Sequence, residues 1–289
     1  MWALRRRPHN KVDLFDDGVW RRVLIIGRSP VGLAVTQTRR GDHPEIEVQM
    51  SSAQSRDVKD EVAALVTRIL GLDLDLSGFY RLCRKDLTLR PLAERLRGMK
   101  PVRYPTVFEA FANAVACQLV SLSAGMHVLN RIAEALGAKV STPMMSSDGI
   151  ALRSFPTAAA IARTNPDALR TLGLSRQKGE YLIELARLAA NPKDRDFNSI
   201  DALGDEAAIE RLSEIRGVGR WTAEYVLLRG FGRVNIFPGD DVGGRNKLYQ
   251  FLGETAAPDY EGVRRIVNRW HPYGGLIYLH LLVDGLAVA

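Results

Sequence analysis

The residues able to do chemistry in this chain are concentrated in the run Leu212–Asp241. A Gly-Val-Gly turn at residues 217–219 separates two helix-like stretches, and two adjacent carboxylates, Asp240 and Asp241, close the run. Glycines let a turn approach another surface closely, and the N–H groups that open the second helix point outward as a site for a phosphate. The turn is therefore expected to hold a DNA backbone.

Amphipathic helices are expected on both sides of this turn. The first has Asp205 in position to cap its start, and its apolar stripe consists of Ile209, Leu212 and Ile215. The second begins near Arg220 and ends at Gly230. Residues 205–230 thus form a helix-hairpin-helix, although an αα-hairpin with a glycine turn is also common in helical proteins as a purely structural unit.

Trp221 and Tyr225 lie four residues apart on one face of the second helix, and Pro238–Asp241 follow it. This combination resembles the helix-hairpin-helix DNA glycosylases, and most closely the AlkA-type branch, DNA-3-methyladenine glycosylase II. That family has a loop rich in Gly and Pro and an essential Asp after the hairpin. The resemblance implies that Asp241 is the catalytic residue, within a loop at residues 236–242.

Further segments keep the family's order over about residues 100–285, which argues against a chance similarity. They are Gln118–Ser121, Phe155–Thr157, Leu172–Leu174, Arg176–Ala190 and Arg269–Tyr273.

In such a glycosylase the departing base leaves positive charge on the sugar, and a fixed carboxylate stabilises that transition state more than the ground state. The resemblance gives this role to Asp241, with activation of the attacking water as a second task. The residues alone do not rank the two acids, because an alternative role for Asp240 is to cap a helix around Val242–Phe251. Gly243–Gly244 is unusually flexible for the start of a helix.

A glycosylase must flip its nucleotide out of the duplex and fill the gap. Leu119, beside Gln118 near the end of an expected helix, matches the family's leucine that enters the duplex where the base has left. The resemblance therefore assigns both residues to DNA binding. The alternative is that Leu119 is an ordinary core leucine.

The base pocket implied by the resemblance is lined by Trp221, Tyr225 and Tyr273. An N-alkylated purine carries a positive charge, and a cation over an aromatic ring gains about 0.5–2 kcal/mol. The alternative is that these are core aromatics, above all Tyr225. Tyr273 stands where related enzymes can have Trp, which leaves the substrate range open.

The hairpin residues expected to contact DNA are Gly217, Val218, Gly219, Arg220 and Thr222. We expect no cofactor and no catalytic metal, since the sequence contains no His/Cys/carboxylate cluster. The resemblance adds one option, a monovalent cation held by the hairpin carbonyls of Ser213, Ile215 and Val218.

The function expected is monofunctional, hydrolytic excision of alkylated purines of the 3-methyladenine and 7-methylguanine class, in base excision repair. One alternative is a glycosylase and lyase of the 8-oxoguanine type, which needs an amine nucleophile. Lyase branches place a Lys two residues after the second hairpin glycine, where this chain has Trp221. A non-catalytic helix-hairpin-helix DNA-binding protein and a helical scaffold that is basic by accident are the remaining candidates.

The elements that must position these residues are mainly helical. Residues 1–100 are expected to form a small α+β domain with an antiparallel sheet, and residues 101–289 a helical glycosylase core. The strand-like stretches are Val23–Ile26, Leu33–Gln37 and Ile46–Met50, and expected helices include Val58–Leu70, about 124–136 and Leu276–Leu286. Thr106 and Glu109 have the spacing of a capping box.

Composition agrees with a DNA partner. The 289 residues include 40 Lys and Arg against 33 Asp and Glu, a net charge of +7 that suits a polyanion. Cys83 and Cys117 are too few for a disulfide scaffold, a zinc site or the four-Cys iron-sulfur cluster of another branch. The sequence shows no signal peptide and no long apolar stretch, so we expect a location in the cytoplasm, at the nucleoid, and no action on a membrane. We also expect a monomer whose partner is double-stranded DNA with damaged bases.

Overall fold

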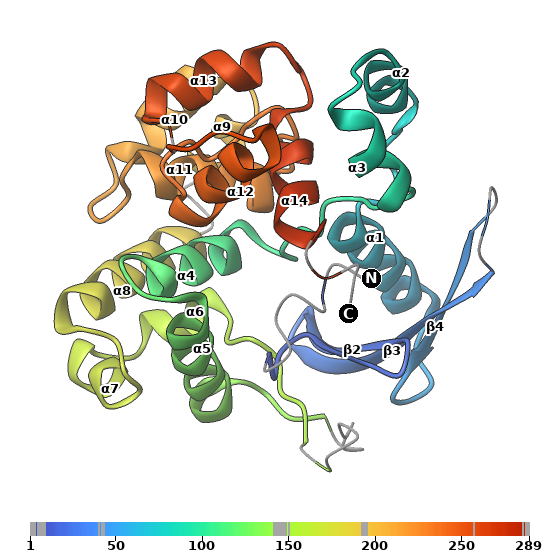
Figure 1. Cartoon of the computed structure of the whole chain (residues 1–289). Coiled ribbons are helices and arrows are strands. Elements are labelled where there is room, and N and C mark those ends of the chain that lie inside the picture. The colour runs from blue at the N-terminus through green and yellow to red at the C-terminus, as the bar shows by residue number, and fades with distance from the viewer. Residues whose placement is uncertain are drawn as a thin grey trace. The chain divides into compact units, whose positions relative to one another are not determined.

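The computed structural model of the chain describes residues 10–39, 44–140, 151–191, 196–256 and 258–284, with the single residues 4, 41, 149 and 286. An antiparallel sheet comes first along the chain, and helices follow (Figure 1). The expected fold class, mainly helical with a small antiparallel sheet first along the chain, is confirmed.

The sheet has strand order β1-β2-β3-β4, and each strand pairs antiparallel with the next. Its strands are β1 (Leu14–Asp16), β2 (Val19–Ile26), β3 (Ser29–Arg39) and β4 (Glu45–Met50). The side chains of Trp20 in β2 and of Leu33 and Val35 in β3 are fully buried. Along β4 exposed residues alternate with half-buried ones, as the sequence pattern predicts for an edge strand with one solvated face.

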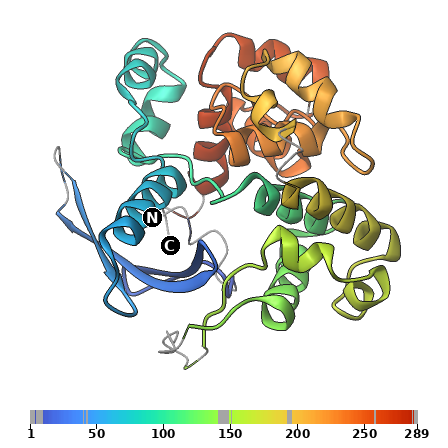
Figure 2. The same ribbon diagram turned by 180° about the vertical axis from the view of Figure 1, so that it is seen from behind.

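Helix α1 (Arg56–Leu70) lies along one face of this sheet in both views (Figures 1 and 2). Val62, Val66 and Ile69 are among its buried residues. Leu65, which the sequence pattern also assigns to the inner face, is only half-buried. The helix ends where Gly71 takes a positive φ of 61°, a conformation that favours glycine.

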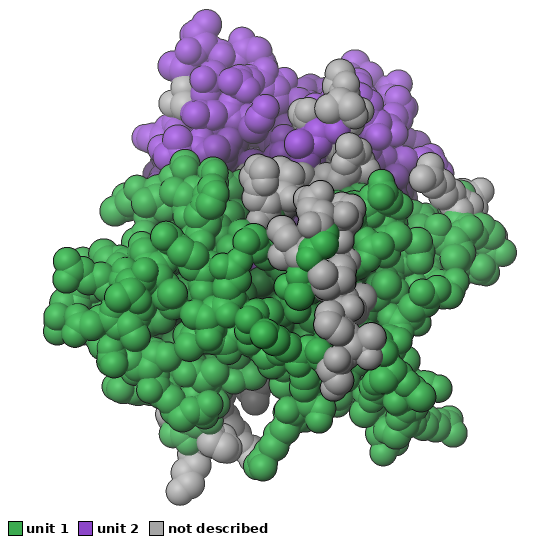
Figure 3. All heavy atoms as spheres, turned by 90° about the horizontal axis from the view of Figure 1, so that it is seen from below, with its two compact units in different colours: residues 1–66, 111–195 green, residues 67–110, 196–289 purple. Residues whose placement is uncertain are grey.

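The chain divides into two compact units that each combine two segments (Figure 3). One comprises residues 1–66 and 111–195, and the other residues 67–110 and 196–289. The domain boundary expected between residues 100 and 101 stays a prediction.

The first unit combines the sheet with helices whose starts are capped as the sequence indicates. Its helices are most of α1, the later part of α4 (Val107–Cys117), α5 (Leu122–Leu136), α6 (Ala158–Ala162), α7 (Pro166–Thr171) and α8 (Arg176–Ala190). Side chains of Ser121, Thr157, Asn165 and Ser175 each accept a hydrogen bond from the amide three residues later. Helix α8 contacts both α6 and α7.

Helices are the regular elements of the second unit among its described residues. Its helices are α2 (Ser77–Lys85), α3 (Leu89–Arg95), the start of α4, α9 (Asp196–Ile200), α10 (Asp205–Ser213), α11 (Arg220–Val226), the π-helical turn η2 (Leu227–Phe231), α12 (Val242–Leu252), α13 (Tyr260–Asn268) and α14 (Gly274–Asp284). Helix α14 is buried over residues 274–283 and contacts α3 and α12. Gly274 and Gly275 let it run against the carbonyls of the chain segment that leads into the Pro238–Asp241 loop.

Three sequence expectations about these helices need correction. Asp205 does not cap α10, because Gly204 is the cap residue and the Asp205 side chain instead binds Arg233 and Asn235. The helix after the hairpin does not end at Gly230, since the π-helical turn carries it to Phe231. The last helix begins and ends two residues before the expected bounds.

Candidate active site

The hairpin turn between α10 and α11 depends on Gly217, which has a positive φ of 84°. Gly219 has an extended backbone, with φ −88° and ψ 175°, and a Cβ built there meets nothing within 4 Å. Its lack of a side chain is therefore not required by the fold. It leaves the main chain open to a close approach from outside.

Three side chains of the hairpin are either buried or hydrogen-bonded within the protein. Val218 and Thr222 are buried, so they have only their main chain to offer to DNA. Arg220 donates to Glu206 at 3.1 Å and to the Tyr260 hydroxyl at 2.8 Å. The Ile215 carbonyl accepts the Val218 amide at 3.0 Å, which closes the turn.

Helix α11 brings the aromatic pair to the Asp241 carboxylate, the predicted catalytic group. The rings of Trp221 and Tyr225 are stacked, with centroids 5.6 Å apart and an interplanar angle of 30°. Trp221 Nε1 donates to Asp241 Oδ2 at 3.2 Å. The Tyr225 hydroxyl shares a 2.8 Å hydrogen bond with that of Tyr104, on the segment before α4. Three of the four side chains expected at the reacting centre thus lie together.

Asp241 is also the N-cap of α12, because its Oδ1 accepts the Gly244 amide at 2.6 Å. The alternative cap, Asp240, is exposed and does not hold this place. Contacts account for both glycines at the start of α12. A Cβ at Gly244 would collide with the Tyr278 ring of α14, and a Cβ at Gly243 would lie 3.2 Å from Asp241 Oδ1. With one donor on each oxygen, the Asp241 carboxylate has a fixed orientation.

Tyr273 belongs to the same unit and contacts α2. Its hydroxyl occupies the space where Gly78 has no side chain, and its ring meets that of Phe79 edge-on at 5.6 Å. Among the described residues these contacts join it to α2, whereas the stacked pair stands on α11. Its place in the base pocket stays a prediction.

Leu119 is the most exposed large apolar side chain described, at 103% of the reference area. It follows the end of α4 and has a φ of 56°, a left-handed conformation that leucine rarely adopts. Lys178 Nζ donates to the carbonyl of the preceding residue, Gln118, at 2.6 Å and so fixes this turn. The alternative that Leu119 is a core leucine is wrong.

Glu224 is a functional candidate that the sequence reasoning missed. It is only 2% exposed, and its carboxylate accepts the Gly239 amide at 3.0 Å and the Tyr260 hydroxyl at 2.6 Å. Burial raises the pKa of Glu224 to about 7, although the hydrogen bonds and Arg220 favour the charged form. The spacing of Arg220 and Glu224, four apart on a helix, was the available signal.

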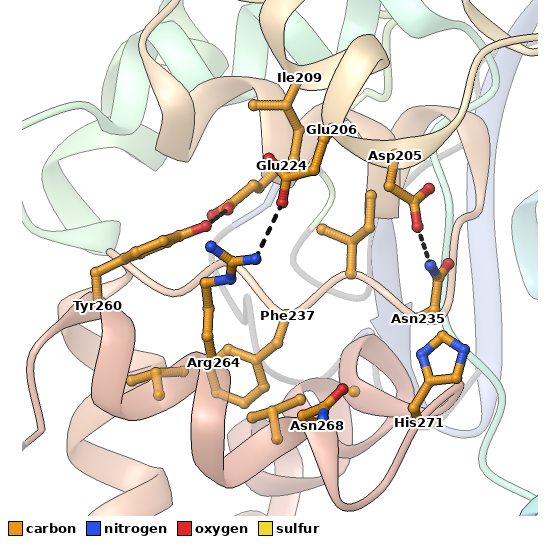
Figure 4. Close-up of a pocket in the computed structure, with 14 residues that line it drawn as sticks. Asp205, Glu206, Ile209, Glu224, Asn235, Phe237, Tyr260, Arg264, Asn268 and His271 are labelled. Carbon is orange, nitrogen blue, oxygen red and sulfur yellow. Dashed lines mark hydrogen bonds and ion pairs between the residues drawn. The ribbon is translucent and has the colours of Figure 1, made fainter.

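A cavity of about 210 Å³ lies between α10, α13 and the segment Asn235–Phe237 (Figure 4). Glu224 and Tyr260 meet at one end of it, and Asp205, Asn235 and His271 stand at the other. In the described part of the chain, no group of three or more His, Cys, Asp or Glu side chains is placed to hold a metal ion. No helix of the described residues is long and apolar enough to cross a membrane.

Two curated relatives and one solved structure that are similar to this chain carry the name 3-methyladenine DNA glycosylase. The DNA-3-methyladenine glycosylase of Bacillus subtilis is 30% identical over 73% of this chain and 68% of its own length. DNA-3-methyladenine glycosylase 2 of Escherichia coli is 31% identical over 96% of this chain and 90% of its own. The solved 3-methyladenine DNA-glycosylase of Archaeoglobus fulgidus superimposes with a TM-score of 0.82 at 27% identity, covering 98% of this chain and 94% of that one.

The family model described as HhH-GPD superfamily base excision DNA repair protein matches residues 113–272. That range contains the hairpin, the stacked aromatic pair and the Asp241 loop. It covers more than half of the chain, and the predicted resemblance is confirmed. The chain therefore belongs to the HhH-GPD superfamily of base excision DNA repair proteins.

Proposed function

We propose that this protein is a monofunctional DNA glycosylase that flips out alkylated purines and hydrolyses their bond to the sugar. The observation that carries the proposal is the Asp241 carboxylate, held by Trp221 beside the stacked Trp221–Tyr225 pair and directly after the hairpin. Relatives that carry the name 3-methyladenine glycosylase support the same substrate class.

In this proposal each group has its own step. A flipped, positively charged purine gains from contact with the electron-rich rings of Trp221 and Tyr225. As the base departs, positive charge grows on the sugar, and the carboxylate of Asp241 stabilises that charge without reorganising. The base leaves in its neutral form and takes the bonding electron pair, so no acid is needed to protonate it. Water attacks the sugar, and Asp241 is the nearby base for its proton.

On the DNA side, we propose that the hairpin main chain at residues 217–222 holds a phosphate and that Leu119 fills the gap in the duplex. Full exposure of Leu119 and the open space at Gly219 support these roles. A monovalent cation on the hairpin carbonyls, a monomeric state and a place at the nucleoid in the cytoplasm remain part of the proposal.

A lyase of the 8-oxoguanine type is the second candidate, and the site disfavours it. The position that holds the nucleophilic Lys in lyases is Trp221 here, and its indole donates to Asp241. The nearest downstream lysine, Lys247, is exposed on α12.

Release of free bases from alkylated DNA tests the proposal. Duplex DNA treated with a methylating agent is incubated with the full chain, and the released bases are separated and identified. We expect 3-methyladenine and 7-methylguanine in solution, with DNA strands that break only after alkali or heat. Binding to the duplex without release of any base would leave a DNA-binding protein and refute the enzymatic assignment.

A further inference from the structure

A buried carboxylate holds the main chain of the loop that carries Asp241. Glu224 Oε2 accepts the amide of Gly239, two residues before Asp241, at 3.0 Å. The Asp241 amide in turn donates to the Pro238 carbonyl at 3.1 Å. A shift at Gly239 is therefore passed through one short turn to the catalytic residue.

Space as well as hydrogen bonding fixes Gly239. A Cβ at this position would come within 2.7 Å of the Tyr260 ring, so the loop main chain lies directly on that ring. The Tyr260 hydroxyl donates to Glu224 Oε1 at 2.6 Å and accepts from Arg220 at 2.8 Å. The contacts thus form a chain from the first residue of α11 to the catalytic loop.

Helix α11 fastens this loop at two points. Trp221 holds the Asp241 carboxylate itself, and Glu224, one turn further along, holds the main chain behind it. Since both come from one helix, the distance between the two points is set by helix geometry. These two contacts keep a short loop that has no regular secondary structure in a single position.

We propose that Glu224 is the positioning residue of the catalytic loop: its carboxylate holds the Gly239 amide and thereby keeps Asp241 aligned with the stacked aromatic pair. This inference rests on the proposed glycosylase activity. It concerns alignment for the chemical step, so it predicts an effect on the rate of excision and none on binding to undamaged DNA.

The charged groups around Glu224 explain why the contact is sensitive to pH. Burial is the largest cause that raises the pKa of Glu224, and the negative charge of Asp240 adds to it. The Tyr260 and Gly239 hydrogen bonds and Arg220 lower the pKa, and the net value is about 7. The flanking charges from α10 and α13 are paired with one another, as Arg264 lies 3.4 Å from Glu206 (Figure 4).

Protonation of Glu224 weakens the fastening. An ionised carboxylate makes stronger hydrogen bonds to N–H and O–H donors than a neutral one. As the pH falls through about 7, the hold on Gly239 is expected to weaken and excision to slow. His271, another lining residue of the cavity, lies at the far end beside Asn235, and none of the described interactions joins it to this loop.

The test measures single-turnover excision and DNA binding separately. The full chain and Glu224→Gln are compared on a duplex with one 7-methylguanine from about pH 5.5 to about pH 8.5, the range in which a group titrating near neutrality is resolved. Affinity for the same duplex without the lesion is measured in parallel. Exposed Glu94→Gln is the matched control for the substitution, and His271→Gln is the control for the far end of the cavity.

We expect the wild-type rate to fall below about pH 7, and Glu224→Gln to be at least about tenfold slower with no such step, at unchanged affinity. Both controls should keep the step. Tyr260→Phe removes a hydrogen bond that lowers the pKa of Glu224, so in that variant the step should move to higher pH. It also keeps the inference testable if Glu224→Gln does not fold.

Different failures have different meanings. A Glu224→Gln enzyme with the wild-type rate and pH step, or a Tyr260→Phe step that does not move, overturns the positioning role alone. Loss of the step in His271→Gln also overturns it. Absence of base release by the wild-type protein overturns both the role and the proposed function.

Discussion

Asp241→Asn is the most informative single substitution, because it separates the two tasks of this side chain. The structure shows Asp241 as the N-cap of α12 through Oδ1 and as the acceptor of the Trp221 indole through Oδ2. Asn is as good an N-cap as Asp, so the cap is retained. The negative charge is lost.

The two effects differ in size. A carboxylate about 4 Å from a unit positive charge contributes about 4 kcal/mol at the effective dielectric of a protein site, which corresponds to about 10³-fold in rate. By contrast, the missing charge at the start of α12 costs about 0.3–1 kcal/mol of stability. We therefore expect a folded protein that binds DNA and excises about 10³-fold more slowly.

The assay is single-turnover release of 3-methyladenine from methylated duplex, with thermal unfolding and duplex affinity measured on the same samples. Asp240→Asn is the matched control, since the adjacent exposed acid has no cap or indole contact. Asp241→Ala should lose the cap too and about 0.5–2 kcal/mol of stability. Near-normal release by Asp241→Asn, or an inactive Asp240→Asn, would refute the assignment.

Four further predictions address the DNA contacts, the buried carboxylate and the reaction type. Gly219→Val should weaken binding to damaged and undamaged duplex alike by about tenfold without loss of thermal stability, because its Cβ meets no atom of the fold; unchanged affinity, measured by fluorescence anisotropy at fixed salt, would make the hairpin merely structural. Leu119→Ala should leave the melting temperature unchanged but slow excision from duplex DNA by about tenfold or more, and a clear drop in melting temperature would contradict its role as a wedge. Because the pKa of Glu224 is about 7 in the folded protein, the unfolded chain loses this proton at a lower pH, and the free energy of unfolding of the wild type falls as the pH rises towards about 7. Relative to wild type, the free energy of unfolding of Glu224→Gln should therefore rise by up to about 3 kcal/mol between about pH 5 and about pH 8. Parallel pH curves for both proteins in denaturant unfolding would disprove this. Borohydride should trap no protein on a duplex with an excisable lesion, because Trp221 stands in place of the lyase amine, and a covalent adduct in good yield would move the protein to the lyase class.

The sequence was sufficient for features that depend on neighbouring residues. Helix starts at Ser121, Thr157, Asn165 and Ser175 were predictable because a cap side chain bonds an amide three residues away. The stacked pair Trp221 and Tyr225 follows from helix periodicity in the same way. Several motifs in one order identified the family, and comparison with known proteins confirmed it.

Other features required the tertiary structure. Asp240 and Asp241 both precede α12, and only the turn closed on Pro238, with α12 packed against Tyr278, decides that Asp241 is the cap. Asp205 looked like a cap by type, but its carboxylate binds partners from the segment after η2. Which acid caps a helix therefore depends on which distant segments of the chain pack beside it.

The sequence by itself therefore determined the hairpin, the caps, the aromatic pair and the family. The tertiary structure decided which acid is oriented by two donors, that Tyr273 packs on α2, and that Glu224 lies buried against the Gly239 amide. The physical reason is range: caps and helix faces arise from contacts within about four residues. The hydrogen bonds that align Asp241 join groups brought together only when α11, α13 and the loop pack in three dimensions.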